Sequence, residues 1–122
     1  MPTRGAIYDA AVLVEIRTYR VRPGQQAALR AGMADAMPLL SAAGIDVVAY
    51  GPSLVDDEGE HAFLIRAFAS VEERDRLEEA FYASPAWRDG PRSAVLDSIE
   101  SHHTVVVELP DVAVEGLRTL GD

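Results

Sequence analysis

Hydrophobic and polar residues alternate along four stretches of the chain, and this two-residue period is typical of β-strands. The stretches are residues 12–21, 45–50, 60–68 and 101–109. Turn-forming residues separate the second stretch from the third, where Gly51-Pro52 is followed by the acidic run 56–60. The alternation therefore predicts four strands, with the second and third joined as a hairpin.

Residues 25–43 carry hydrophobic residues with the spacing of an amphipathic helix. The predicted buried stripe consists of Leu29, Met33, Ala36, Met37 and Leu40. Pro23-Gly24 precedes this segment, and Gly44 follows it as a predicted helix cap. Because Pro38 lies inside the pattern, we expect the helix to be kinked or shortened there.

A second helical region follows the third strand. Ser70 is its predicted N-cap, and Glu73 three residues later completes the sequence signature of a capping box. Ser84-Pro85 indicates another helix start, with serine as the cap and proline in the first turn. We expect residues 92–99 to add a further helical turn or two. The segment 110–122 then forms a tail with spaced apolar residues.

The predicted order is β-α-β-β-α-β, the ferredoxin-like arrangement of an α+β protein with an antiparallel four-stranded sheet and helices on one face. The third strand carries apolar residues on both faces, with Phe63 and Ile65 on one and Leu64 on the other. The sheet face without helices would expose such side chains, and an exposed apolar face needs a cover. The simplest cover is the same face of a second copy, so we expect a symmetric homodimer.

Composition narrows the class of protein. The chain of 122 residues suits one domain with a single core, and 48% of its residues are hydrophobic. A formal net charge of −9 argues against nucleic acid and anionic membranes as partners. Cysteine is absent, which excludes disulfides, a thiolate nucleophile and Cys-based metal sites. The apolar run near the N-terminus is too short for a signal peptide or a membrane span, so we expect a cytoplasmic protein.

Three segments resemble one known family. The first predicted strand and its end read EIRTYRVRPG, in which Glu15, Arg17 and Tyr19 alternate before a Pro-Gly stop. The other two are PLLSAAGIDVVAYG, residues 38–51, and ASVEERDRLEEAFYASPAW, residues 69–87. Together they resemble the NIPSNAP family, within the dimeric α/β-barrel superfamily.

The resemblance covers residues 12–109, which we take as one NIPSNAP-like domain. It leaves a lead-in of residues 1–11 and a tail of residues 110–122 that we expect to pack on the partner subunit. It implies a ferredoxin-like protomer, a homodimer, and a pocket between sheet and helices. It implies no single reaction, because the superfamily includes cofactor-free monooxygenases, isomerases, cyclases, haem-degrading enzymes and proteins without known activity.

A row of polar residues lies on one face of the first predicted strand. Glu15, Arg17 and Tyr19 share that face because side chains alternate. The strand is central in this fold, so the charges must pair or line a wet cavity. Two readings stay open: a structural Glu15–Arg17–Arg66 network, or a ligand pocket in which Arg17 or Arg66 holds a carboxylate or enolate oxygen.

Histidine and tyrosine supply the candidate acid–base groups. His102 and His103 are neighbours on the fourth strand and point to opposite faces, so only one of them can serve a given site. Tyr19 and Tyr50 are candidate hydroxyl donors. Trp87 is expected to anchor the core, and its alternative role is a pocket wall that stacks on a flat ligand.

These residues make up the candidate site. The catalytic candidates are His103, His102 and Tyr19, and the substrate-binding candidates are Glu15, Arg17, Tyr50, Arg66 and Trp87. We expect no metal and no cofactor, because the chain has no H-x-x-x-H pair, no EF-hand spacing, no phosphate-binding loop and no dinucleotide fingerprint. Haem ligation by a single histidine has no specific support.

Two functional hypotheses follow. In the first, a homodimer binds a small, largely apolar molecule between sheet and helices and acts as a cofactor-independent acid–base enzyme of isomerase, cyclase or monooxygenase type, in secondary or catabolic metabolism. In the second, the dimer is a non-catalytic interaction or ligand-binding protein. The second predicts that the polar row is paired with itself and has no cavity beside it.

Overall fold

The structure, a computed structural model, describes residues 10–120. Most of the expected lead-in, residues 1–9, therefore lies outside the described residues, as do residues 121–122. The strands are β1 (Ala11–Val21), β2 (Asp46–Pro52), β3 (His61–Phe68) and β4 (Ile99–Pro110). They form one antiparallel four-stranded sheet in the order β2-β3-β1-β4, which confirms the predicted ferredoxin-like fold.

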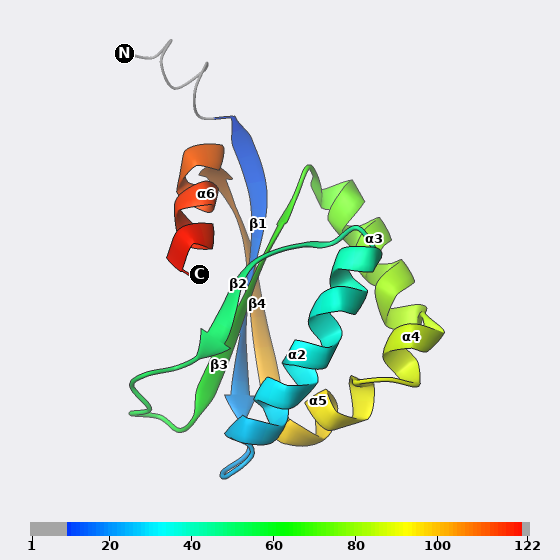
Figure 1. Cartoon of the computed structure of the whole chain (residues 1–122). Helices are drawn as coiled ribbons and strands as arrows, with labels where there is room; N and C mark the ends of the chain where they lie inside the picture. The colour runs from blue at the N-terminus through cyan, green and yellow to red at the C-terminus, as the bar shows by residue number, and fades with distance from the viewer. Residues whose placement is uncertain (1–9, 121–122) are drawn as a thin grey trace.

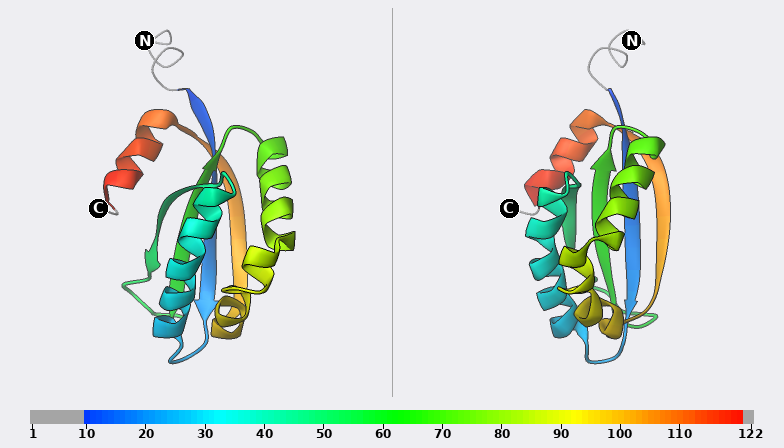
Figure 2. Two further views of the ribbon diagram at one scale, coloured as in Figure 1. Left: turned by 45° about the vertical axis from the view of Figure 1, so that its right-hand side comes forward. Right: turned by 90° about the vertical axis from the view of Figure 1, so that its right-hand side faces the viewer.

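The helices lie on both sides of this sheet (Figures 1 and 2). Helices α2 (Gln26–Ala42), α3 (Val71–Ala83), α4 (Pro85–Arg88) and α5 (Arg92–Ser98) cover one face. Helix α6 (Asp111–Leu120) folds back onto the other face from the end of β4. The main core therefore lies between the sheet and α2–α5, and a smaller apolar cluster lies beneath α6.

The helix ends follow the sequence signals. The Glu73 amide donates to the Ser70 hydroxyl at 3.0 Å, and the Trp87 amide donates to the Ser84 hydroxyl at 3.3 Å. Each bond satisfies an amide that the first helical turn leaves unpaired. Gly44 has φ +81° just beyond the C-cap of α2, a conformation that glycine adopts without strain.

Helix α2 differs from the expectation at Pro38. The helix continues through this proline to Ala42 and is not shortened. Leu40, beyond the proline, is buried in the main core, and its burial offsets the hydrogen bond that proline cannot donate. Within the predicted stripe Met37 is only partly buried, while Gly32 is buried and takes part in the packing against α5.

The sheet face opposite α2–α5 is not bare, as the sequence suggested, but partly covered by α6. Val114 of α6 is 2% exposed and packs on Val14, Val48 and Ala67 of the sheet. The Arg118 guanidinium holds the helix to the start of β2 by two contacts with the Asp46 carboxylate, at 2.5 and 2.8 Å. Val114 and Leu117 of the tail thus lie on the side of a helix that packs on its own sheet.

Candidate functional site

A cluster of charged side chains lies between the sheet and α3. Glu15 of β1 is the register partner of Arg66 of β3, so their side chains stand side by side on the helix-covered face. Arg17 lies on the same face one pleat further along β1. Helix α3 adds Arg74, Glu78 and Tyr82, which share one side of the helix because they are spaced by four residues.

Glu15 is the centre of this cluster and is completely buried, as is Arg66. Arg66 donates from Nε to Glu15 Oε1 at 2.7 Å, and its Nη2 lies 2.6 Å from the same oxygen. Arg74 donates to Glu15 Oε2 from Nη2 at 2.9 Å and from Nε at 3.2 Å. Arg17 Nη2 reaches the same oxygen at 3.4 Å. Three guanidiniums therefore neutralise one buried carboxylate, as a charge in a low-dielectric site requires.

Glu78 is held more loosely by the same cations. Its Oε2 lies 3.2 Å from Arg66 Nη2 and 3.5 Å from Arg74 Nε, and its Oε1 lies 3.7 Å from Arg17 Nη2. Neither Glu78 Oε2 nor Arg66 Nη2 makes a hydrogen bond of good geometry within the described residues. Glu78 is therefore the member of the cluster with the weakest direct contacts.

Two hydroxyl groups complete the surroundings of the guanidiniums. The Tyr82 hydroxyl accepts from Arg66 Nη1 at 2.8 Å and from Arg17 Nη1 at 3.3 Å. Both guanidinium carbons also lie within 6.0 Å of the centre of the Tyr82 ring, a cation–π distance. Thr104 of β4 accepts from Arg17 Nε at 3.0 Å. Arg66 is thus engaged on all sides, whereas Arg17 bonds mainly to neutral oxygens.

The two carboxyl groups respond to this environment in opposite directions. Burial works to raise the pKa of Glu15, but a hydrogen bond with Glu78 and the charges of Arg66, Arg74 and Arg17 outweigh it, so the pKa lies below its usual value. Burial, together with the hydrogen bond to Glu15 and its negative charge, raises the pKa of Glu78 to about 7. Glu15 therefore stays ionised at neutral pH, while Glu78 lies near the midpoint of its titration.

A cavity of about 440 Å³ adjoins the cluster, between the sheet and α3–α5. Its walls are Arg17, Tyr19, Glu78, Tyr82, Trp87, Arg92, Val95, Leu96, Ile99 and His102. The wall combines apolar and aromatic side chains with cations, a carboxyl group and an imidazole. A mostly apolar hollow with a few converging polar groups is the usual form of a small-molecule site.

The structure brings several of the sequence-predicted residues together at this cavity. Arg17, Tyr19, Trp87 and His102 line it. His102 is the register partner of Tyr19, which places the imidazole on the helix-covered face. Burial is the main reason that the pKa of the Tyr19 hydroxyl rises to about 12, so it remains a neutral donor. Trp87 also anchors the core, with its ring centre 5.5 Å from that of Phe81.

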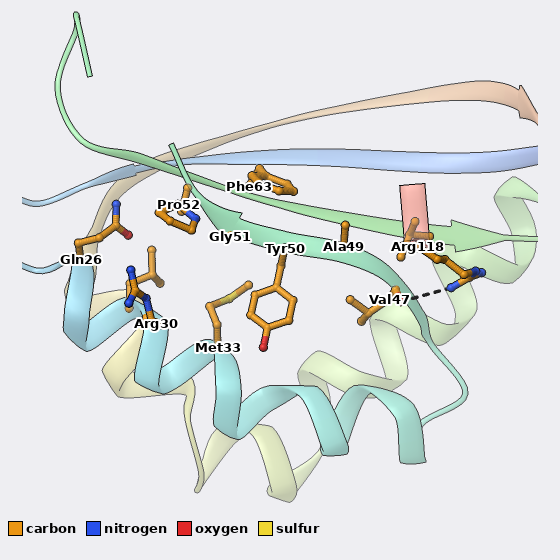
Figure 3. Close-up of a pocket in the computed structure, with 13 residues that line it drawn as sticks. Gln26, Arg30, Met33, Val47, Ala49, Tyr50, Gly51, Pro52, Phe63 and Arg118 are labelled. Carbon is orange, nitrogen blue, oxygen red and sulfur yellow. Dashed lines mark hydrogen bonds between the residues drawn. The ribbon is translucent and has the colours of Figure 1, made fainter. Parts of the chain in front are cut away.

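The other predicted residues lie elsewhere. Glu15 and Arg66 lie behind the cavity, in the buried ion cluster, and do not line it. His103 is paired with Thr18 and lies on the opposite sheet face. Tyr50 is on β2, at the free edge of the sheet, and lines a second hollow of about 420 Å³ between that strand and α2. Figure 3 shows its ring beside the Met33 side chain, with Arg30 on one side and Arg118 on the other.

Sequence reasoning missed Glu78, Tyr82, Thr104 and Arg92. A signal for two of them was present in residues 69–87, because Arg74, Glu78 and Tyr82 recur at four-residue spacing beside the apolar stripe of the same helix. Such a polar row on a helix facing a charged strand indicates an internal ion network. Thr104 and Arg92 have no comparable signal, because only the tertiary structure places them at Arg17 and at the cavity.

The described residues form neither a metal-ion cluster nor a membrane-spanning helix. Within residues 10–120, no three His, Asp or Glu side chains come together in a way that could hold a metal ion. None of the helices in this part of the chain is long and apolar enough to cross a bilayer.

Comparison with known proteins identifies the family. The sequence model of the NIPSNAP family matches residues 14–110. A NIPSNAP family protein of unknown function from Agrobacterium tumefaciens is 25% identical, with a TM-score of 0.71 over 81% of this chain and 88% of that one.

Two further solved structures share the fold. A dimeric protein of unknown function with a ferredoxin-like fold from Bacteroides fragilis is 12% identical, with a TM-score of 0.61 over 80% of this chain and 95% of that one. A putative antibiotic biosynthesis monooxygenase from Bordetella bronchiseptica is 24% identical, with a TM-score of 0.60 over 81% and 95% of the two chains. No curated protein matches the sequence significantly. The match over residues 14–110 covers most of the chain, and the protein therefore belongs to the NIPSNAP family.

Proposed function

We propose that the protein is a homodimer that binds a small, largely apolar organic molecule with an acidic oxygen in the cavity between the sheet and α3–α5. The observation that carries the proposal is the composition of the cavity wall. Trp87, Val95 and Ile99 contribute apolar surface to the wall, and Arg17 and His102 contribute polar groups. Such a wall matches a ligand with a hydrocarbon or aromatic body and one anionic group.

Arg17 is the group best suited to bind that anionic oxygen. Its side chain is 13% exposed at the cavity, and its contacts with the carboxylates of Glu15 and Glu78 are 3.4 and 3.7 Å long. Arg66 is completely buried and already engaged by Glu15, Glu78 and Tyr82. A ligand carboxylate or enolate can therefore bind Arg17 without breaking the central ion pair, and a guanidinium offers two parallel donors for it.

The reaction type that this wall supports is proton transfer. His102 is exposed and faces the cavity, and the neutral Tyr19 hydroxyl beside it can orient a carbonyl oxygen. An imidazole for the proton and a guanidinium for the developing enolate are sufficient for isomerisation, cyclisation or the first step of a cofactor-independent oxygenation. The likeness to a putative antibiotic biosynthesis monooxygenase supports a reaction of this type.

We further propose that the protein is cytoplasmic and that residues 12–109 are its functional domain.

The homodimer rests on the sheet face opposite α2–α5. Beyond the part that α6 covers, β4 presents Val105 and Val107, which are 42% and 37% exposed on that face. Exposed apolar strands of this kind are stabilised by a second copy of the same face. The dimeric protein with the same fold supports the arrangement. We also predict that α6 contacts the partner subunit.

The test is a comparison of variants by native mass spectrometry after purification under mild conditions. The wild type is expected to carry a small organic acid, and Arg17→Ala is expected to lose it. Arg88→Ala, which removes an arginine that does not line the cavity, should retain it. His102→Ala should bind the molecule and fail to turn it over. Retention of the molecule by Arg17→Ala would contradict the proposed site.

The non-catalytic alternative is favoured by one observation, which is that Glu15 and Arg66 are fully paired with each other. It predicted no cavity beside the polar row, however, and a cavity of about 440 Å³ adjoins Arg17. If the wild-type protein neither carries nor binds a small molecule, the non-catalytic alternative is favoured. A haem-related role is tested by an absorption titration, in which the absence of a Soret shift on adding haem excludes it.

A further inference from the structure

Glu78 occupies the boundary between the buried ion cluster and the cavity. Its side chain is 12% exposed and lines the cavity, while its two oxygens contact the guanidiniums of Arg17, Arg66 and Arg74. A group in this position must respond to any anion that enters, because the entering charge uses the same cations. An anion that binds in the proposed site is therefore expected to change the protonation of Glu78.

The response follows from the distances around Arg17. Its Nη2 atom is 3.7 Å from Glu78 Oε1, so a carboxylate that binds this nitrogen from the cavity lies next to the Glu78 carboxylate. Two like charges at such a distance in a dry site repel strongly. Protonation of Glu78 removes the repulsion and gives the ligand a second donor, an O–H group beside the guanidinium.

We infer that the cavity takes up organic carboxylates together with one proton, which is bound by Glu78. This inference rests on the proposed function, and it names both the ligand class and the residue that senses its charge. The balance is simple: an ionised ligand and a proton from solvent enter, and ionised Glu78 becomes a carboxylic acid that donates to the ligand. No covalent bond is formed.

The surroundings of Glu78 favour protonation of its carboxylate. The Glu78 Oε1 atom lies 3.7 Å from Arg17 Nη2, beyond hydrogen-bond distance, so a proton on this oxygen displaces no donor of Arg17. Burial and the neighbouring Glu15 raise the pKa of Glu78 to about 7, so the proton is gained at little cost near neutral pH. Glu15 keeps its contacts with Arg66 and Arg74 and stays ionised, which leaves the central ion pair intact.

The other charged and titratable groups around Glu78 define the controls. They are Glu15, Arg17 and Tyr19 of β1, Arg66 of β3, Arg74 and Tyr82 of α3, Arg92 of α5 and His102 of β4. The guanidiniums keep their charge at neutral pH, and the pKa of Tyr19 is about 12. His102 is an imidazole in the same wall, and it requires a variant of its own.

The experiment uses benzoate as the probe, with isothermal titration calorimetry at pH 7.5 in buffers that differ in ionisation enthalpy. Because Glu78 with a pKa of about 7 is mostly ionised at that pH, the wild type should take up about 0.8 proton per benzoate bound. Its affinity should fall about eightfold between pH 7.5 and 8.5. Glu78→Gln should bind benzoate with no proton uptake and no such fall.

Two further variants locate the effect. His102→Gln should retain the proton uptake of the wild type, and so should Glu79→Gln, which changes an exposed carboxylate on the same helix. Uptake that persists in Glu78→Gln, or that is lost in His102→Gln, overturns the assignment. Benzoate binding that is lost in Arg17→Ala but brings no proton in the wild type overturns the inference and leaves the proposed site standing. A wild type that binds no benzoate even at pH 6 overturns both.

Discussion

Arg66 Nη2 lies 2.6 Å from Glu15 Oε1, and both side chains are completely buried between the sheet and α3. The antiparallel register of β1 and β3 places the two residues opposite each other. The pair forms the inner wall of a charged cluster whose outer members, Arg17 and Glu78, reach the cavity. The buried ion pair and the residues that reach the cavity are thus different members of one cluster.

Removal of the central carboxylate should strongly destabilise the protein. Glu15→Gln leaves Arg17 and Arg66 with Glu78 as their remaining close carboxylate, and breaking a buried pair in this way costs about 3–5 kcal/mol. The matched control is Arg20→Gln, which breaks the exposed pair with Glu100 and should cost less than about 1 kcal/mol. Urea denaturation monitored by Trp87 fluorescence measures both. Equal losses in the two variants would contradict the central role of Glu15.

Glu78 should make stability depend on pH in an unusual direction for a carboxyl group. The pKa is raised from 4.5 to about 7 on folding, so the native state holds a proton more tightly than the unfolded state between these values. The contribution of Glu78 to the free energy of unfolding is therefore present in full below pH 4.5 and is lost as pH rises through 7. Glu15 has a lowered pKa, and its contribution is lost instead as pH falls below its usual value.

The measurement is a series of urea titrations between pH 5 and pH 8. The wild type should lose stability relative to Glu78→Gln as the pH rises across this range, because the glutamine variant carries no proton to release. Glu79→Gln, on the exposed side of α3, should follow the wild type. A constant difference between wild type and Glu78→Gln would show that Glu78 does not bind a proton in the native state.

The opposite sheet face should control dimer formation. A Val105→Asp and Val107→Asp double variant places two charges on the exposed apolar part of β4 and is expected to be monomeric in sedimentation velocity at micromolar concentration. Leu54→Asp is the control, because Leu54 is 93% exposed in the β2–β3 hairpin, and it should remain dimeric. A wild type that sediments as a monomer would refute the homodimer itself.

Two glycines should respond to alanine in opposite directions. Gly44→Ala forces a side chain into φ +81° and should destabilise the protein by about 1 kcal/mol. Gly116→Ala lies in α6, where an added Cβ meets nothing within 4 Å, and it should stabilise the helix by about 0.5–1 kcal/mol. Thermal unfolding of the two variants measures the difference. A loss of stability in Gly116→Ala would show that the packing of α6 is tighter than its contacts indicate.

Local signals in the sequence were enough for most of the fold. The alternation in residues 12–21 and the capping residues Ser70 and Ser84 predicted elements that the structure contains, because strand period and cap chemistry act over a few residues. The shortening of α2 that Pro38 suggested does not occur, since Leu40 beyond the proline is buried in the main core. The sequence indicated only a tail with spaced apolar residues where α6 lies, because the packing of α6 on the sheet depends on residues that are distant in the chain.

Strand alternation in the sequence was enough to place Glu15, Arg17 and Tyr19 in one polar row, and it pointed to Arg66 as the partner from another strand. The folded structure was needed to show which of them line the cavity and which are sealed in an ion pair. Helix α3 makes that division, because it places Arg74 and Glu78 over Glu15 and leaves Arg17 beside the hollow that His102 and Trp87 enclose. Strand alternation fixes the face of a side chain, but its burial depends on what packs above that face.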